Sequence, residues 1–253
     1  MGTFQHYVPR VYLQGFTDPA TPTSQEPYVW VLDSKQKSVK RRSPRNIAGE
    51  NDYYESVGIT GGPGAGVESR LARIEGRFKA ELDRITAQGV HACGFDDRII
   101  WFLATLGVRT PWGRRAIEQL LEHHPPAAGG LVGLSEQEQW AASVEYLAEW
   151  AAEYFRRMDW LLIGPMVPDL FFCTSDRPVV LTGSHMDGSS MDILRLTEKS
   201  AVVTVPLTSR LALIGSYDRA NFLDRGVSVE WINDRTIENS ERFVFLSHSP
   251  NNP

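Results

Sequence analysis

The sequence has only two cysteines among its 253 residues, Cys93 and Cys173, and neither has a partner at C-x-x-C spacing. This scarcity excludes a disulfide scaffold and a zinc site built from thiolates, because both need several closely spaced cysteines. His91, His185 and His248 are scattered in the same way, so we assign no metal ligands. Both cysteines are expected to be buried, reduced thiols.

Long apolar runs and the common enzyme motifs are also missing. No uncharged segment approaches the roughly 20 residues that span a bilayer, and the first residues lack the pattern of a signal peptide. We therefore expect a cytoplasmic protein with no membrane partner. The P-loop, G-x-G-x-x-G and G-x-S-x-G patterns do not occur, which removes the usual sequence evidence for nucleotide binding or serine hydrolysis. The cofactor stays unknown.

The chain does have the composition of a folded protein, with 42% hydrophobic and 23% charged residues. Its net charge of -5 argues against a surface that binds nucleic acid all over, so any such contact must be local. One stretch is strongly basic, and its charged residues are Lys35, Lys37, Lys40, Arg41, Arg42 and Arg45. These side chains could contact phosphates, but a solvated edge strand is the commoner explanation.

Hydrophobic periodicity predicts a hairpin followed by helices. Residues 28–32 and 38–42 are expected to form the hairpin, because the first run is rich in β-branched and aromatic residues and a turn separates the two. Apolar residues spaced by three and four predict a helix over 67 to about 87. Further helices are expected from about 96 to 109, from 111 to about 123, and from 135 to about 155. The middle of the chain, about 67–158, is thus helical.

Short apolar runs between turn residues then predict the strands of one sheet. These runs are residues 160–163, 170–173, 179–181, 201–205 and 211–214, and a closing helix is expected from about Asp234. We therefore predict a single α+β domain over residues 1–253. Its N-terminal hairpin (28–42) and central helices pack on a C-terminal mixed or antiparallel sheet (about 160–216).

A dense polar and aromatic segment opens the chain, from Gln5 to Phe16. Pro9 suits the first turn of a helix, so His6 and Tyr7 stand at the helix entrance, where free backbone N–H groups favour an anion. His6 is a candidate general acid or base, with Tyr7 and Arg10 orienting or binding a substrate oxyanion. The alternative is that His6 and Tyr7 tie the N-terminal segment to the rest of the fold.

Two further segments place polar side chains at the ends of predicted elements. Ser175, Asp176 and Arg177 follow an apolar run, so Asp176 is a candidate general base or metal ligand, while Ser175 and Arg177 are candidates for substrate binding. Ser-Asp-Arg-Pro is equally good turn chemistry. Arg109 ends an apolar helix, where it could bind an anion through two N–H groups or complement the helix dipole.

The opening residues Gln5 to Phe16 resemble the bacterial domain of unknown function 4238 family, whose members begin with QHYVP-x-x-YL-x-x-F. The resemblance extends over nearly the whole chain. It continues through residues 46–48, Tyr53 and Tyr54, 68–85, 109–111, 174–178, 205–207 and 233–245. It implies that these polar segments belong to one recurrent unit, and it brings no activity with it.

Two classes of function remain open. The first is a hydrolase or transferase acting on an anionic, phosphate-containing substrate, which requires His6, Arg109 and Asp176 to converge on one pocket. The second is a non-catalytic module that binds nucleic acid or a protein partner through the basic hairpin, and a defence or toxin-type effector is compatible with either class. The cost of ordering polar side chains at element ends favours the enzyme.

Overall fold

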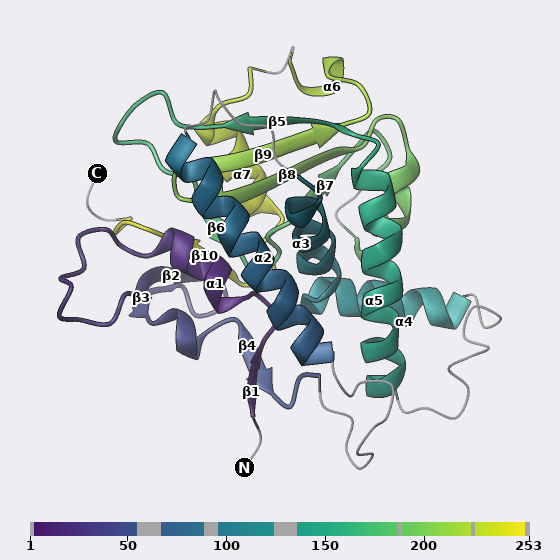
Figure 1. Cartoon of the computed structure of the whole chain (residues 1–253), viewed down its shortest axis with the longest axis horizontal. Helices are drawn as coiled ribbons and strands as arrows, with labels where there is room; N and C mark the ends of the chain where they lie inside the picture. Colours follow the sequence, from purple (N-terminus) through teal and green to yellow (C-terminus); the bar gives the residue numbers. More distant parts are fainter. Residues whose placement is uncertain are drawn as a thin grey trace.

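The chain folds into an α+β structure in which helices pack against three antiparallel sheets (Figure 1). The computed structural model describes residues 3–54, 67–88, 96–123, 136–186, 189–223 and 226–250. In these ranges no helix combines the length and hydropathy needed to cross a bilayer. Cys93, the glycine-rich segment 61–66 and the helix start expected at Ser135 lie outside the described residues.

The predicted hairpin forms one half of a four-stranded sheet. β2 (Val29–Asp33) pairs with β3 (Ser38–Arg42), as expected, and β10 (Phe243–Leu246) and β6 (Thr174–Ser175) complete the order β3-β2-β10-β6. All pairings are antiparallel. An early strand, β2, is therefore paired with the last described strand, β10, and β3 and β6 lie at the two edges of this sheet.

A second four-stranded sheet takes most of the other predicted strands. β5 (Asp159–Ile163), β9 (Leu211–Ser216), β8 (Val202–Thr208) and β7 (Val180–Thr182) lie in that order and are antiparallel. A third, two-stranded sheet pairs β1 (Phe4–His6) with β4 (Gly49–Asn51), which the sequence did not predict. Four of the five predicted late runs thus form one antiparallel sheet, as expected, while β1 and β4 are strands that the sequence did not indicate.

Residues 170–173 were expected to be a strand of the late sheet, and they are not. The Asn233 side chain satisfies their backbone instead, donating to the Phe171 carbonyl and accepting from Cys173 N–H, both at 2.9 Å. Phe172 N–H donates to the Ser209 carbonyl at 3.0 Å. Because these groups already have partners, the segment needs no neighbouring strand.

The four central helices occur where periodicity predicts them. They are α2 (Val67–Gln88), α3 (Asp97–Val108), α4 (Pro111–His123) and α5 (Glu136–Phe155). The closing helix α7 (Val229–Glu238) begins before the expected Asp234, because the Ser228 side chain caps it by accepting from Trp231 N–H. Shorter helical segments are α1 (Arg10–Leu13), η1 (Gln14–Phe16), η2 (Pro44–Asn46), η4 (Ser190–Thr197) and α6 (Ala220–Leu223).

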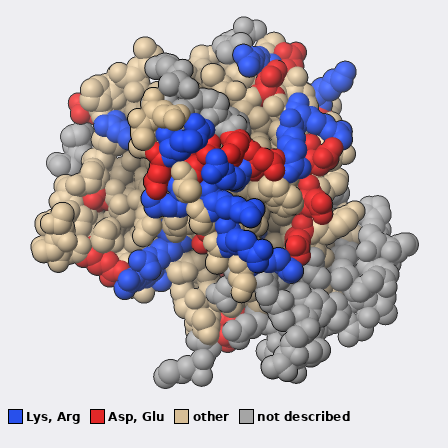
Figure 2. Space-filling model, viewed as in Figure 1, with Lys and Arg blue, Asp and Glu red and all other residues tan. Residues whose placement is uncertain are grey.

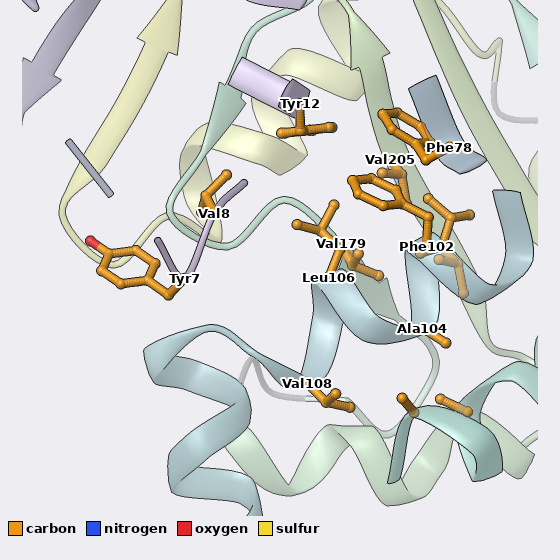
Figure 3. Packing of buried hydrophobic residues seen from close by; sticks show 14 of the residues in the cluster. Tyr7, Val8, Tyr12, Phe78, Phe102, Ala104, Leu106, Val108, Val179 and Val205 are labelled. Atoms are coloured by element: carbon orange, nitrogen blue, oxygen red, sulfur yellow. The ribbon is translucent and has the colours of Figure 1, made fainter. Parts of the chain in front are cut away.

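The main core joins the N-terminal segment to α2 and α3. The Phe78 and Phe102 rings stack with their centroids 3.6 Å apart, and Tyr12 lies 6.0 Å from the Phe102 ring (Figure 3). All three side chains are fully buried, and Val205 of β8 belongs to the same cluster. The opening segment is therefore part of the core, and its polar residues are held in fixed positions.

Candidate functional site

His6 and Arg109 lie together, as the enzyme hypothesis requires. Arg109 donates through Nη2 to the His6 carbonyl oxygen at 2.6 Å and through Nη1 to Glu75 at 2.7 Å, and its Nε donates to the Tyr54 hydroxyl at 2.8 Å. Tyr54 in turn donates to the His6 carbonyl at 3.1 Å. The His6 ring donates through Nε2 to the Pro44 carbonyl at 3.0 Å. These contacts join five separate segments of the chain.

The electrostatics of this pair fit a structural role. Burial lowers the pKa of His6, and the nearby positive charge of Arg109 lowers it further. Burial also works against the charged form of Arg109, but Tyr54 and Glu75 outweigh it and raise the pKa of the guanidinium. Arg109 is only 4% exposed and stays charged, and its hydrogen bonds are used within the chain.

Asp176 joins the β6 end to the start of β10. Its carboxylate accepts from three consecutive backbone N–H groups, those of Glu241, Arg242 and Phe243, at 2.9, 2.8 and 2.9 Å. Burial raises the pKa of Asp176 to about 6, although these three hydrogen bonds favour the carboxylate. Asp176 thus titrates closer to neutral pH than an ordinary carboxyl group.

Ser175 and Arg177 shape the turn that follows β6. The Ser175 hydroxyl donates to the Arg177 carbonyl at 3.0 Å and accepts from Arg177 N–H at 3.2 Å. The Arg177 guanidinium lies 4.0 Å above the Trp112 ring and lines, with Arg115, a cavity of about 840 Å³. Burial lowers the pKa of Arg177 to about 10, Asp192 raises it and Arg115 lowers it further.

Tyr7 faces a different cavity, of about 280 Å³, which we call the hairpin cavity. Phe4, Tyr7 and residues 46–49 line one side, and side chains of β2, β3 and β10 line the other. Three cations border it, Lys40, Arg42 and Arg242, together with one carboxylate, Asp33. The hairpin cavity therefore combines part of the opening segment with part of the basic stretch.

Strand alternation explains which basic residues reach the hairpin cavity. Lys40 and Arg42 lie on one face of β3, opposite Val31 and Val29 of β2, and both line the cavity or its rim. Arg41 points to the other face, where its guanidinium lies 5.2 Å from the Tyr28 ring centroid. Two of three consecutive cations are thus directed to the same space.

Arg242 and Asp33 form an ion pair at the edge of this cavity. The shortest contact, from Arg242 Nη2 to Asp33 Oδ2, is 2.7 Å. Hydrogen bonds from Arg242 hold the pKa of Asp33 at about 2. The pair is neutral as a unit, so Lys40 and Arg42 supply the remaining positive charge.

The Tyr7 hydroxyl points away from the other side chains of the cluster (Figure 3). Tyr7 is 6% exposed, and within the described ranges nothing forms a hydrogen bond with its hydroxyl. Burial raises the pKa of Tyr7, as do the negative charges of Asp176 and Glu50, while Arg242 opposes the shift. The hydroxyl therefore stays protonated and can donate a hydrogen bond into the hairpin cavity.

The structure thus divides the predicted site residues into separate groups. His6 lies with Arg109, and Tyr7 lies within electrostatic range of Asp176, but no contact among the described residues joins Arg109 to Asp176. Arg177 lines the cavity of about 840 Å³ beside Trp112, and Arg10 is exposed at the start of α1. Nor do three His, Cys, Asp or Glu side chains cluster as metal ligands in the part of the chain that is described.

Sequence reasoning missed the contribution of β3 to a cavity. From the sequence, all the basic residues between positions 35 and 45 were assigned the same role, either on a solvated edge strand or on a phosphate-binding surface. β3 is an edge strand, with exposed Lys40, Arg41 and Arg42, but its two faces have different surroundings. The signal that could have been used is the alternation itself, because residues 40 and 42 must share a face of the hairpin.

The segments that resemble the family contact one another around the opening residues. The Ala48 carbonyl accepts from Tyr7 N–H at 3.0 Å and from Val8 N–H at 3.1 Å. The Tyr12 and Thr174 hydroxyls lie 2.7 Å apart. These residues form one hydrogen-bonded unit although they are widely separated in the sequence.

The comparison with known proteins matches the same segments to one family. No curated protein and no solved structure matches the chain. The family described as "Protein of unknown function (DUF4238)" matches residues 5–249, from the opening segment to beyond β10. The chain therefore belongs to the DUF4238 family.

Proposed function

We propose that this protein binds a small anionic ligand, of the phosphate-containing class, in the hairpin cavity. The observation that carries the proposal is the Tyr7 hydroxyl, a protonated donor with no hydrogen-bond partner in the described structure, which faces a cavity bordered by cations. Because this hydroxyl opens on the cavity, water or a ligand there can accept its hydrogen bond.

The charges around the cavity favour an anion. Arg242 is neutralised by Asp33, which leaves Lys40 and Arg42 as the net positive charge. Lys40 makes one hydrogen bond, at 3.3 Å to Gln36, and Arg42 has no acidic partner among the residues described. Phosphate oxygens accept charge-assisted hydrogen bonds from such groups and from a hydroxyl.

The size of the cavity favours a small molecule over a nucleic-acid duplex. Its volume of about 280 Å³ is at the lower end of the range of ligand pockets. A duplex would contact the outer surface of the hairpin and would engage Arg41 as much as Arg42. Different effects of these two residues would therefore separate the two classes of ligand.

A hydrolase or transferase acting on that ligand is the second candidate function. The raised pKa of Asp176 favours it, because a carboxyl group that titrates near pH 6 is suited to proton transfer. Asp176 is buried and does not itself line the hairpin cavity, but it lies within electrostatic range of Tyr7, which does. In this form of the proposal Tyr7 binds the substrate and Asp176 exchanges the proton.

The test is calorimetric titration with inorganic phosphate and pyrophosphate. R42Q and Y7F are each expected to weaken binding about tenfold or more, since each removes a hydrogen bond to a charged ligand. R41Q is the matched control, because it removes an equal charge from the adjacent position on the opposite face. Equal effects of R41Q and R42Q, or no binding by the wild type, would overturn the proposal.

A separate assay addresses catalysis. Release of 4-nitrophenol from 4-nitrophenyl phosphate is followed for the wild type and for D176N. Loss of turnover in D176N with unchanged phosphate affinity supports the enzyme. Binding without turnover by the wild type supports a binding protein and rejects phosphomonoester hydrolysis.

A further inference from the structure

Another cavity, which we call the helix groove, lies between α2, α3 and α5. It has a volume of about 330 Å³, within the range of small-molecule sites. Its floor is apolar and is formed by Leu71, Ile74, Trp101, Val144 and Ala148. Leu71, Val144 and Ala148 are buried, while Ile74 and Trp101 remain partly exposed to the groove. The helix groove shares no residue with the hairpin cavity.

Arginines border this apolar floor. Arg70, Arg73 and Arg77 come from α2, where spacings of three and four residues place them on one face, and Arg98 comes from α3. Figure 2 shows positively charged side chains across the middle of the molecular face on which α2 lies. Two carboxylates, Asp97 and Glu145, also line the groove, where they pair with Arg156 and Arg70. The groove therefore has a predominantly cationic rim above a hydrophobic surface.

Only part of this positive charge is neutralised. Arg70 pairs with Glu145 at 3.0 Å, and Arg98 pairs with Glu81 at 2.7 Å. Arg73 and Arg77 are exposed, and no carboxylate in the described structure pairs with either. The two neighbouring guanidinium groups repel each other, so an anion placed between them would be stabilised by both.

We propose that the helix groove binds a free amphiphilic anion, a small molecule with an apolar body and a single anionic head. The body lies on Ile74 and Trp101, and the head lies between Arg73 and Arg77. This ligand matches both features of the groove, whereas a simple phosphate would leave the floor uncovered and a neutral hydrocarbon would leave the guanidinium groups unpaired. The concave shape between three helices favours a single free molecule over a bilayer surface.

The probe is 8-anilinonaphthalene-1-sulfonate, whose fluorescence rises in apolar surroundings, with decanoate as competitor. The double variant R73Q/R77Q is expected to weaken probe binding about tenfold or more. R219Q is the matched control, because Arg219 is an exposed arginine outside the groove whose nearest carboxylate contact is 3.8 Å. Decanoate should displace the probe from the wild type at lower concentration than decanol does.

Three results would overturn the proposal. They are equal probe affinity in R73Q/R77Q and R219Q, equal competition by decanoate and decanol, and binding of the protein to anionic phospholipid vesicles without any binding of free decanoate. I74D provides a second variant, which introduces a negative charge on the floor and should reduce binding while the arginines remain. Saturating inorganic phosphate, which lacks an apolar body, should leave probe binding to the helix groove largely unchanged, so the helix groove and the hairpin cavity are tested separately.

Discussion

The Arg109 guanidinium donates to the His6 carbonyl oxygen at 2.6 Å, across 103 positions of sequence. The same guanidinium binds Glu75 of α2 and Tyr54 after β4. One side chain at the end of α3 thus holds the opening segment against α2. His6, the candidate general acid or base of the opening segment, therefore has a structural role through its backbone carbonyl.

Replacing Arg109 should therefore destabilise the fold strongly. R109M keeps much of the side-chain length but leaves Glu75 without its cation and removes the hydrogen bond to His6. Breaking a buried ion pair in this way costs about 3–5 kcal/mol. Urea denaturation followed by circular dichroism measures the loss in the free energy of unfolding.

An exposed pair gives the control for this measurement. Arg157 and Glu153 lie 2.6 Å apart on the surface, each side chain more than half exposed. R157M should cost only about 0.5 kcal/mol. If R109M and R157M lower the free energy of unfolding equally, the buried contacts of Arg109 contribute no more to stability than an exposed ion pair does.

The helices and the hairpin could be predicted because their signals are local. Apolar spacing defines α2 through residues within two turns of each other, and Asp96 caps α3 by accepting from Arg98 N–H. The division into separate sheets could not be predicted. It depends on Asn233 of α7 satisfying the backbone at Phe171 and Cys173, about 60 positions away.

The candidate sites also depend on contacts between distant segments, which the sequence alone does not predict. The sequence singles out Tyr7 and the basic stretch, but it contains no sign that β3 faces the opening segment across a cavity. That relation follows from the pairing of β2 with β10, near the other end of the chain. The helix groove was not predicted at all, because periodicity assigns Ile74 to the packed face of α2 and cannot tell a packed position from the floor of a groove.

Tyr12 offers a test of the coupling between the opening segment and the sheets. Its hydroxyl donates to the Pro206 carbonyl at 2.5 Å and lies 2.7 Å from the Thr174 hydroxyl. Y12F leaves both oxygens buried with one partner fewer, so it should cost about 1–3 kcal/mol.

A double-mutant cycle measures how much of that cost comes from the hydroxyl pair. Y12F, T174V and the double variant are compared by urea denaturation. The double variant should lose less stability than the sum of the single variants, because removing both hydroxyls leaves neither of them unpaired. Strict additivity would mean that Tyr12 and Thr174 do not interact energetically.

Two glycines should respond to alanine in opposite directions. A Cβ at Gly113 would lie 2.3 Å from the Val108 carbonyl oxygen, where α4 follows α3 closely. G113A must therefore move the backbone near Arg109 and should cost about 1–3 kcal/mol. A Cβ at Gly76, in the exposed face of α2, meets nothing within 4 Å, so G76A should stabilise the helix by about 0.5–1 kcal/mol. Thermal unfolding of both variants decides this, and a loss of stability in G76A would contradict it.

Asp176 should make stability depend on pH in the direction opposite to that of an ordinary ion-paired carboxylate. Burial raises the pKa of Asp176 from 3.8 to about 6 in the folded protein. Between these values the folded state binds more protons than the unfolded state does, so the free energy of unfolding falls as pH rises. A shift of about two pKa units corresponds to a fall of about 3 kcal/mol, complete above about pH 6.

The comparison with D176N isolates this contribution from other titrating groups. The difference in the free energy of unfolding between the wild type and D176N should decrease from about pH 4 to about pH 6 and stay constant above that. Asparagine cannot titrate, and it keeps one oxygen to accept from the backbone N–H groups of residues 241–243. A difference that is flat from about pH 4 to about pH 6 and instead increases with pH below about pH 4 would mean that the three backbone hydrogen bonds outweigh burial and lower the pKa of Asp176. That result would also remove the electrostatic support for a role of Asp176 in proton transfer.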